Sequence, residues 1–393
     1  MMESDNKKLV FSLREDKLGK GEVKFCWQPG CRWLAIIGDT KVVIILDRLG
    51  KKVTEFQLLS LGKVKQMIFD YEGDTLAILQ ENYSKITIIN VHTKKLFEME
   101  IERNNKDYPT AIKWTKNDSF LGVGTHLGLI YIYNKLTSKL IPCALCHSNA
   151  INSCDWNSDG LLVTSSEDKS FSVTGKAGNA VMQGVKLKDI PKYIRWINTK
   201  GNLSITANED NNLDYQNINK TTNNSNSTTT VSTITANRCI LIYDITKKSK
   251  PIELELSAEY GNIMTYEPVG DHYIAVAFTK GAVSIVSIHE TEIKNSAKKL
   301  QPFKAGIDDI SVCNEVNRLA IAGESCVKIY DTLSYEEITD ERIDIPQTAG
   351  RISNIKWSES GNILVVSTLL GGLFAYNVIV NESYATSSKF YYK

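Results

Sequence analysis

A unit of about 40–45 residues recurs along this chain of 393 residues. Each copy holds an apolar strand that ends on a large side chain, a turn containing Gly, Asp or Asn, and two further apolar strands separated by a tight turn. A repeat of this period is typical of the blades of a β-propeller, each of which is one small sheet. The sequence therefore predicts an all-β chain of eight such units, whose first strands end at Trp27, Phe69, Trp114, Trp156, Trp196, Tyr266, Val312 and Trp357.

A ring of such units needs a contact between its two ends. The N-terminal strand Leu9–Leu13 can add as the outermost strand of the last blade, whose own three strands end near Asn377. Radial closure buries each sheet face against the next sheet and protects most strand edges. We therefore expect a single WD40-type propeller over residues 1–380 with eight blades, the alternative being seven blades plus an irregular unit. Residues 381–393 are expected to begin a connection to a following domain.

One interval between successive units is longer than the others. It runs from Trp196 to Tyr266 and contains an Asn- and Thr-rich segment, at about residues 209–236, that is almost free of large apolar side chains after Tyr215. Such a segment buries too little apolar surface to offset its ordering entropy, so we expect a disordered insertion there. We place it between the second and third strands of its blade, on the same face as His147.

The segment Cys143-Ala-Leu-Cys-His147 has the spacing of a c-type haem attachment sequence. In the repeat, however, it falls between the outer strand of the third blade and the first strand of the fourth, where WD40 repeats carry a His. Asp168 follows about twenty residues later, in the turn between the second and third strands. We therefore expect a buried His147 to donate to Asp168 and to tie this blade together, which contributes roughly 1.5–3 kcal/mol. Haem and zinc are disfavoured, because no second Cys pair, axial ligand or signal peptide accompanies the motif.

Composition excludes several classes of function. The 46 Lys and Arg residues nearly balance the 45 Asp and Glu residues, so no global field would gather nucleic acid. No window of the sequence approaches the roughly 20 consecutive apolar residues of a transmembrane helix. The N-terminus lacks a secretory apolar core, so the eight cysteines are expected to be reduced. No catalytic, cofactor-binding or metal-binding motif is found, and we expect neither a cofactor nor enzymatic activity.

Lysines recur after the third strands, where they are expected to be solvated and to protect sheet edges. The densest group is a candidate basic patch for lipid headgroups or acidic partners, formed by Lys294, Lys298, Lys299 and Lys304. Binding at such a patch would be sensitive to salt. A charge run of this kind is more often a solvated face than a binding site, so both interpretations stay open.

Several strings, in their order along the chain, resemble one family beyond the general WD40 pattern. They are Phe11-Ser-Leu-Arg-Glu-Asp-Lys-Leu-Gly19, Leu46-Asp-Arg-Leu-Gly-Lys-Lys-Val-Thr-Glu55, Tyr260-Gly-Asn-Ile263, Cys326-Val-Lys-Ile-Tyr-Asp331 and Gly361-Asn-Ile-Leu-Val-Val-Ser-Thr368. Over residues 9–380 the chain resembles the family of intraflagellar transport protein 144, the WD-repeat subunit of intraflagellar transport complex A. That family continues into a second propeller and a helical repeat region, so the present sequence is similar to the N-terminal propeller alone. The Asn-rich insertion is a departure from the family.

The resemblance implies a non-enzymatic scaffold that binds other proteins in retrograde ciliary transport and in the passage of membrane cargo into cilia. The implied partners are other complex A subunits and membrane-cargo adaptors, and the implied locations are the cilium, the ciliary base and the cytoplasm. The chain itself is expected to be monomeric. Two other classes stay open: a coat-like propeller of vesicle trafficking that recognises cargo tails or membranes, and a propeller enzyme or metal protein.

Overall fold

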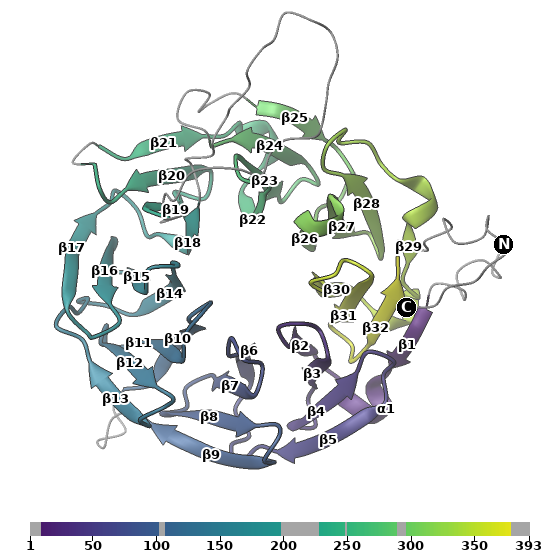
Figure 1. Cartoon of the computed structure of the whole chain (residues 1–393). Helices are drawn as coiled ribbons and strands as arrows, with labels where there is room; N and C mark the ends of the chain where they lie inside the picture. The colour runs from purple at the N-terminus through teal and green to yellow at the C-terminus, as the bar shows by residue number, and fades with distance from the viewer. Residues whose placement is uncertain (1–8, 102–106, 198–227, 248–249, 289–295, 379–393) are drawn as a thin grey trace, which may run out of the picture.

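The computed structural model describes residues 9–101, 107–197, 228–247, 250–288 and 296–378. In these residues the chain forms eight antiparallel sheets of four strands each, arranged as a closed ring around a central opening (Figure 1). Each sheet runs outward from an inner strand at the opening to an outer strand at the rim. The predicted all-β propeller with eight blades is confirmed, and the alternative with seven blades is wrong.

Within each blade the strands follow sequence order from the opening to the rim, except that the outer strand of blade 8 is the first strand of the chain. Blade 1 comprises β2 (Lys24–Trp27), β3 (Trp33–Ile37), β4 (Val42–Asp47) and β5 (Lys52–Gln57), and blade 2 comprises β6 (Val64–Phe69), β7 (Thr75–Gln80), β8 (Lys85–Asn90) and β9 (Lys95–Glu100). Blade 3 comprises β10 (Pro109–Trp114), β11 (Phe120–Thr125), β12 (Ile130–Asn134) and β13 (Lys139–Pro142), and blade 4 comprises β14 (Ile151–Trp156), β15 (Leu161–Ser166), β16 (Ser170–Gly175) and β17 (Ala180–Lys186). Blade 5 comprises β18 (Lys192–Ile197), β19 (Thr230–Thr235), β20 (Cys239–Asp244) and β21 (Ile252–Glu255), and blade 6 comprises β22 (Ile263–Val269), β23 (Tyr273–Phe278), β24 (Val283–Ser287) and β25 (Ser296–Leu300). Blade 7 comprises β26 (Asp309–Cys313), β27 (Arg318–Gly323), β28 (Cys326–Asp331) and β29 (Ile343–Asp344), and blade 8 comprises β30 (Ile352–Trp357), β31 (Ile363–Thr368), β32 (Leu373–Asn377) and β1 (Leu9–Leu13).

Helical structure is confined to short pieces between strands. They are α1 (Glu15–Leu18) and the 3₁₀ turns η2 (Ala258–Tyr260), η3 (Asn314–Val316), η4 (Thr339–Glu341) and η5 (Gln347–Ala349). None of the helices in the described residues has the length and apolar character needed to cross a membrane.

The ring is closed by β1, which pairs antiparallel with β32 as the outer strand of blade 8. Leu9 lies opposite Tyr376 and Leu13 lies opposite Leu373, so segments from the two ends of the chain share one sheet. Phe11 of β1 also packs against Gly50, in the turn between β4 and β5 of blade 1. The contact is so close that a Cβ atom added to Gly50 would lie 2.3 Å from the Phe11 ring. The predicted closure by the N-terminal strand is confirmed.

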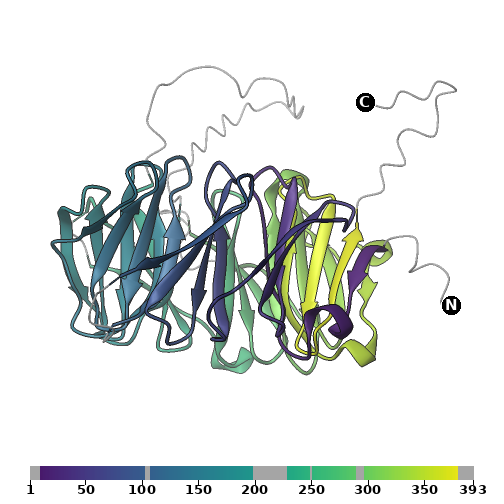
Figure 2. The ribbon, with the colours of Figure 1, turned by 90° about the horizontal axis from the view of Figure 1, so that it is seen from below.

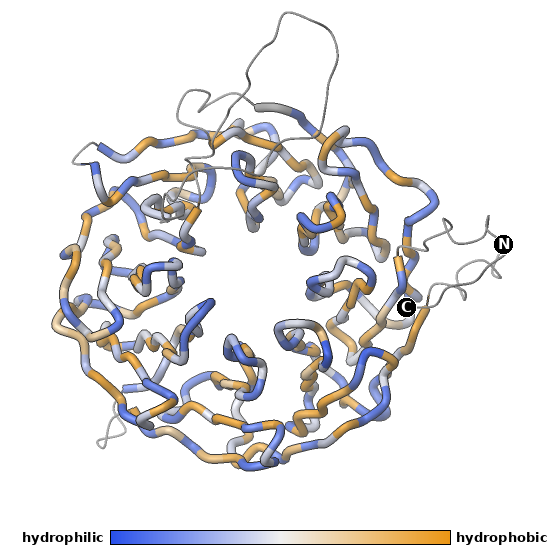
Figure 3. The backbone as a smooth tube through the Cα atoms, in the orientation of Figure 1, coloured by the Kyte–Doolittle hydropathy of each residue, from blue (hydrophilic) through white to orange (hydrophobic). Residues whose placement is uncertain are grey.

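The hydrophobic core lies between neighbouring sheets rather than in one central mass. The second strands β3, β7 and β31 are buried at every position, because both faces of their sheets pack against another blade. Trp156 and Leu162 of blade 4, for example, pack in one cluster with Ile132 of blade 3. Figure 3 shows hydrophobic stretches along the strands and hydrophilic stretches in many of the turns. The continuous apolar runs of the sequence are therefore strands packed between two other sheets.

In three blades the tryptophan at or near the end of the inner strand also makes a polar tie to the preceding blade. The indole Nε1 of Trp156 donates to the carbonyl oxygen of Lys113 at 2.9 Å, and that of Trp196 donates to the carbonyl oxygen of Asp155 at 3.1 Å. Trp357 makes the same contact with the inner strand of blade 7 at 3.1 Å. At these three seams a buried indole combines a large apolar surface with a satisfied donor.

In blade 6 the residue that ends the inner strand is not Tyr266, as the repeat predicted. Pro268, which pairs with Ile274 of the second strand, occupies the register position that Trp27 holds in blade 1. Tyr266 lies two residues earlier and is fully buried, with its hydroxyl donating to a main-chain carbonyl of blade 5 at 2.8 Å. The pattern is misleading because β22 ends at Val269, three residues past its large aromatic side chain.

The predicted insertion at about residues 209–236 is wrong at its C-terminal end. Thr230–Thr235 forms β19, the fully buried second strand of blade 5. Its threonines were interpreted as loop residues, although β-branched side chains favour strands and pack well on a pleated surface. Residues 209–227 of the predicted insertion, and the predicted connection at 381–393, lie outside the described residues.

The ring has two faces, which differ in the loops they carry. The connection face carries the connections between blades, such as residues 143–150, and the turns between second and third strands. The opposite face, uppermost in Figure 2, carries the turns between first and second strands, such as residues 157–160, and those between third and fourth strands. β18 is the first strand of blade 5 and β19 is the second, and the chain passes from one to the other at the opposite face. The prediction that the insertion follows the second strand of its blade, on the face of His147, is therefore wrong.

Replacing Trp156 by Phe should cost more stability than replacing Trp114 by Phe. Both side chains are buried, but the Trp156 indole donates to a carbonyl oxygen, whereas the Trp114 Nε1 is buried without a partner in the described residues. Loss of a buried hydrogen bond should lower the free energy of unfolding of Trp156→Phe by about 1–2 kcal/mol more than that of Trp114→Phe. Urea denaturation of both variants measures the difference, and equal losses would argue against the tie between blades.

Candidate functional site

His147 lies in the connection that leads into blade 4, and it is buried against the sheet of that blade. Its Nδ1 is 3.1 Å from Asp168 Oδ2 and 3.2 Å from Ser170 Oγ. Its Nε2 is 3.1 Å from the hydroxyl of Thr164. Asp168 also accepts from the main-chain N–H of Ser148 at 3.0 Å. The two residues that the sequence pairs are thus in contact, and two hydroxyl groups that the sequence analysis missed complete the network.

Burial sets the charge state of His147. Loss of solvation lowers the pKa of the imidazole below its ordinary value of 6.5, although Asp168 acts in the opposite direction. The hydrogen-bond pattern assigns the proton of the neutral ring to Nδ1, which donates to the Asp168 carboxylate, while Nε2 accepts from the Thr164 hydroxyl. The pKa of Asp168 lies below its ordinary value, because hydrogen bonds to its carboxylate outweigh the effect of burial.

The two cysteines beside His147 do not form a metal or haem site with it. Both ring nitrogens of His147 are engaged by groups of blade 4, so neither is free to be a ligand. Cys143 packs among apolar residues between blades 3 and 4, and burial raises its pKa to about 12, so it is held as a thiol. Cys146 is exposed. Across the described residues, no three His, Cys, Asp or Glu side chains are grouped as metal ligands.

The structure does not gather the described members of the predicted basic patch at one point. Lys298 and Lys299 are neighbours on β25, so their side chains leave opposite faces of the sheet. Lys299 Nζ lies 5.4 Å from the centre of the Tyr260 ring. Lys304 lies in the connection to blade 7, where its main-chain N–H donates to a carboxylate at 2.8 Å. Lys294 lies outside the described residues.

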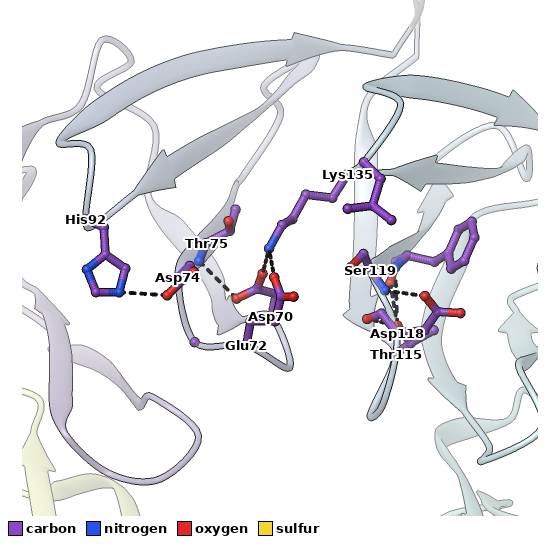
Figure 4. A network of polar contacts seen from close by, with 12 residues as sticks. Asp70, Glu72, Asp74, Thr75, His92, Thr115, Asp118, Ser119 and Lys135 are labelled. Carbon is purple, nitrogen blue, oxygen red and sulfur yellow. Dashed lines mark hydrogen bonds and ion pairs between the residues drawn. The ribbon is translucent and has the colours of Figure 1, made fainter.

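On the opposite face, basic side chains link two blades to the blade before them. Lys135, directly after the third strand of blade 3, has its Nζ 2.5 Å from a carboxylate oxygen of each of Asp70 and Glu72 in blade 2 (Figure 4). Asp70 is almost fully buried and also accepts from a main-chain N–H of its own turn at 2.9 Å. Lys176, at the equivalent place in blade 4, pairs with Asp118 of blade 3 at 3.1 Å. The sequence signal for this contact is a Lys that directly follows a third strand.

Charged side chains from different blades also meet in the central opening. Glu267 of blade 6 accepts from Arg195 of blade 5 at 3.1 and 3.2 Å, and from Lys356 of blade 8 at 3.1 Å. Although burial raises the pKa of Glu267, these two cations lower it to about 2. Asp155 and Lys113 form a further pair at 3.6 Å. The signal that could have found these five residues is a charged residue one or two positions before the end of an inner strand.

Comparison with known families assigns the chain. The family model described as the first β-propeller of WDR19 matches residues 23–371. The chain belongs to the WDR19 first β-propeller family. Intraflagellar transport protein 144, the family named from the sequence, is WD repeat-containing protein 19, so the predicted family is confirmed. The WDR19 family is one of scaffold propellers and not of enzymes.

Curated relatives of the WDR19 family match nearly the whole chain. Over 370 residues the chain is 28% identical to WD repeat-containing protein 19 of Mus musculus and 26% identical to that of Homo sapiens. Each alignment covers 94% of this chain and 26% of the relative. WD repeat-containing protein dyf-2 of Caenorhabditis elegans is 24% identical over 324 residues, which covers 82% of this chain and 22% of the relative. The chain thus spans about a quarter of the length of these relatives.

Solved structures with the same ring include a designed and a natural propeller. The computationally designed Ika8 protein aligns with a TM-score of 0.70 at 12% identity, covering 94% of this chain and 100% of that one. The C-terminal WD40 domain of Sif2 aligns with a TM-score of 0.67 at 13% identity, covering 95% of this chain and 98% of that one. At these identities the likeness shows the fold of the WDR19 propeller alone.

Replacing His147 by Ala should destabilise the propeller. The imidazole is buried and bonded to Asp168 and Thr164, so its removal should lower the free energy of unfolding by about 2–3 kcal/mol. His92→Ala is the matched control, because His92 Nε2 lies 2.8 Å from Asp74 but both side chains are substantially exposed, and such a pair contributes about 0–1 kcal/mol. Urea denaturation compares the two, and a loss in His147→Ala no larger than in His92→Ala would mean that the blade 4 network is not a tie.

The neutral state of buried His147 should make stability depend on pH. Its pKa is lower in the folded chain than the ordinary 6.5, so the unfolded chain takes up the proton first as the pH falls. The stability that the neutral ring contributes is therefore full above pH 6.5 and decreases below it. His147→Gln removes this component, so its urea midpoint should vary less than that of the wild type between about pH 7.5 and 5.5. A steeper pH dependence in the variant would contradict a neutral His147.

Proposed function

We propose that this chain is the scaffold propeller of an intraflagellar transport complex A subunit that acts in retrograde ciliary transport and in the passage of membrane cargo into cilia. The observation that carries the proposal is the match of residues 23–371 to the first β-propeller of WDR19. The order of the sequence strings that resemble intraflagellar transport protein 144 supports it independently of the fold. Since many unrelated functions share the propeller, the fold alone would not support a function.

The surface of the ring suits a docking platform for proteins. Exposed leucines lie on both faces: Leu59, Leu61, Leu127, Leu369 and Leu370 on the connection face, and Leu49, Leu136 and Leu333 on the opposite face. Apolar side chains in solvent, surrounded by polar loops, can form the buried centre of a protein interface. The net charge of +1 favours protein partners over nucleic acid.

The proposal extends to partners and location. We propose that other complex A subunits and membrane-cargo adaptors bind this ring, and that the protein resides in the cilium, at the ciliary base and in the cytoplasm. The chain by itself is proposed to be monomeric, since closure of the ring leaves no open end to pair with a second copy.

Affinity purification of the full-length native protein from ciliated cells tests the proposal. Subunits of complex A should be enriched with it, and cells that lack it should form short cilia or cilia swollen with stalled cargo. Enrichment of vesicle-coat subunits would favour the coat-like alternative, and a diffuse cytosolic distribution with normal cilia would contradict the proposal.

Two matched substitutions test docking through the exposed leucines. Leu61 on the connection face is 81% exposed and Leu136 on the opposite face is 76% exposed. Asp at either place should change the free energy of unfolding by no more than about 0.5 kcal/mol, because neither side chain is packed in the isolated ring. At least one variant should recover complex A subunits severalfold less well than the wild type. Undiminished recovery by both would contradict docking through these side chains.

A further inference from the structure

A cavity of about 410 Å³ opens onto the central opening where blades 8, 1 and 2 meet. Figure 1 shows their inner strands β30, β2 and β6 next to one another around the opening. The polar part of the cavity wall comes from these strands and consists of Lys24, Lys65, Gln66, Asn354 and Lys356. The volume lies within the range of about 300–1,000 Å³ that is common for small-molecule sites.

The wall of this cavity carries positive charge that is incompletely neutralised. Lys24, Lys65 and Lys356 line it, and no carboxylate is among its lining residues. Lys24 pairs with Glu22 outside the wall at 2.5 Å, but Glu22 also holds Lys63 at 3.1 Å. One carboxylate is thus shared between two ammonium groups on this side of the cavity.

The other two lysines differ in how far acids compensate them. The carboxylate that Lys356 contacts at 3.1 Å, that of Glu267, is shared with the guanidinium of Arg195. Asp309 also acts on Lys356, and although burial raises its pKa to about 6, it keeps most of its negative charge at neutral pH. Lys65 donates to a main-chain carbonyl of blade 3 at 2.7 Å and forms no ion pair with an acid in the described residues. The cavity therefore favours an anion.

The seam between blades 8 and 1 lacks the indole tie, as does the seam between blades 2 and 3, where Trp114 Nε1 is also buried without a partner in the described residues. Trp27 lines the cavity, and its buried Nε1 has no hydrogen-bond partner in the described residues. The equivalent indoles of blades 4, 5 and 8 donate to the preceding blade. A ligand that contacts Lys356, Lys24 and Lys65 would span blades 8, 1 and 2, and would join blades across this seam.

We propose that this cavity binds a small, soluble anion that carries more than one phosphate group. Lysine is a compact, strongly charged donor to phosphate oxygens, and three ammonium groups on three blades fit separated phosphate groups better than a single carboxylate. The amide of Asn354 adds a neutral donor on the same wall. Because the inner strands lie inside the ring, a flat bilayer cannot reach them, and the ligand is one that is free in solution.

Isothermal titration calorimetry of the purified chain at fixed ionic strength tests the site. Pyrophosphate and inositol hexakisphosphate are the soluble probes, and vesicles containing phosphatidylinositol 4,5-bisphosphate are the membrane probe. At least one soluble probe should bind saturably with one site per chain and should raise the thermal midpoint of unfolding, because it binds the folded ring alone. The vesicles should neither bind through this site nor compete with the soluble probe.

Four variants assign the binding to the cavity. Lys65→Gln should weaken binding about 10- to 100-fold, as expected for loss of one hydrogen bond to a charged group, whereas Lys65→Arg should retain it. Lys24→Gln is a second loss-of-charge variant that leaves Glu22 paired with Lys63. Lys298→Gln, a change at an exposed lysine on the outer strand of blade 6, should bind like the wild type.

Three results would overturn the proposal. One is the absence of saturable binding of both soluble probes to the wild type. Another is an equal loss of affinity in Lys65→Gln and Lys298→Gln, which would show non-specific association with surface lysines. The third is vesicle binding that Lys65→Gln abolishes, which would assign the site to a lipid headgroup. None of these results bears on the proposed docking of complex A subunits, which is measured separately.

Discussion

Each sheet of this ring is apolar on both faces, and both faces can be buried only if the ring closes. The second strands β3, β7, β19 and β31 are buried at every position, and the other four second strands are buried at every position but the first. Full burial of one Val, Leu or Ile side chain contributes about 1.5–3 kcal/mol, so an unpaired sheet face would be costly. Blade 8 must therefore meet blade 1, and β1 completes blade 8 while Phe11 packs on the turn between β4 and β5 of blade 1. Closure is thus the condition on which the separate blades depend.

Polar contacts then fix how neighbouring blades lie against each other. Around the opening, indole groups such as that of Trp156 donate to the inner strand of the preceding blade. On the opposite face, Lys135 bridges to Asp70 of the blade before it (Figure 4). In the opening, Glu267 joins cations from two other blades. Because these charges largely compensate one another, the cavity beside Lys65, where compensation fails, is the place at which a small anion would bind.

The blade count, the closing strand and the His147 to Asp168 contact were predictable from the sequence, since each depends on local pattern or on a fixed place in the repeat. The start of β19 could not be predicted in this way, because a Thr-rich segment resembles a loop when only large apolar side chains are counted. The register of Pro268 was hidden by the displaced aromatic side chain of Tyr266. Glu267 and Lys356 each stand near the end of an inner strand, but their contact with one another depends on closure of the whole ring and could not be predicted from the sequence.

Hydrogen exchange of the backbone amides tests most directly whether the ring is held by its closure. If blade 8 and blade 1 open only when the whole propeller unfolds, the paired amides of β1 and β32 should exchange with the same free energy of opening as those of β7 and β11. Fast exchange of β1 and β32 at a free energy well below that of the other blades would show that closure is a peripheral contact and not the condition on which the other blades depend.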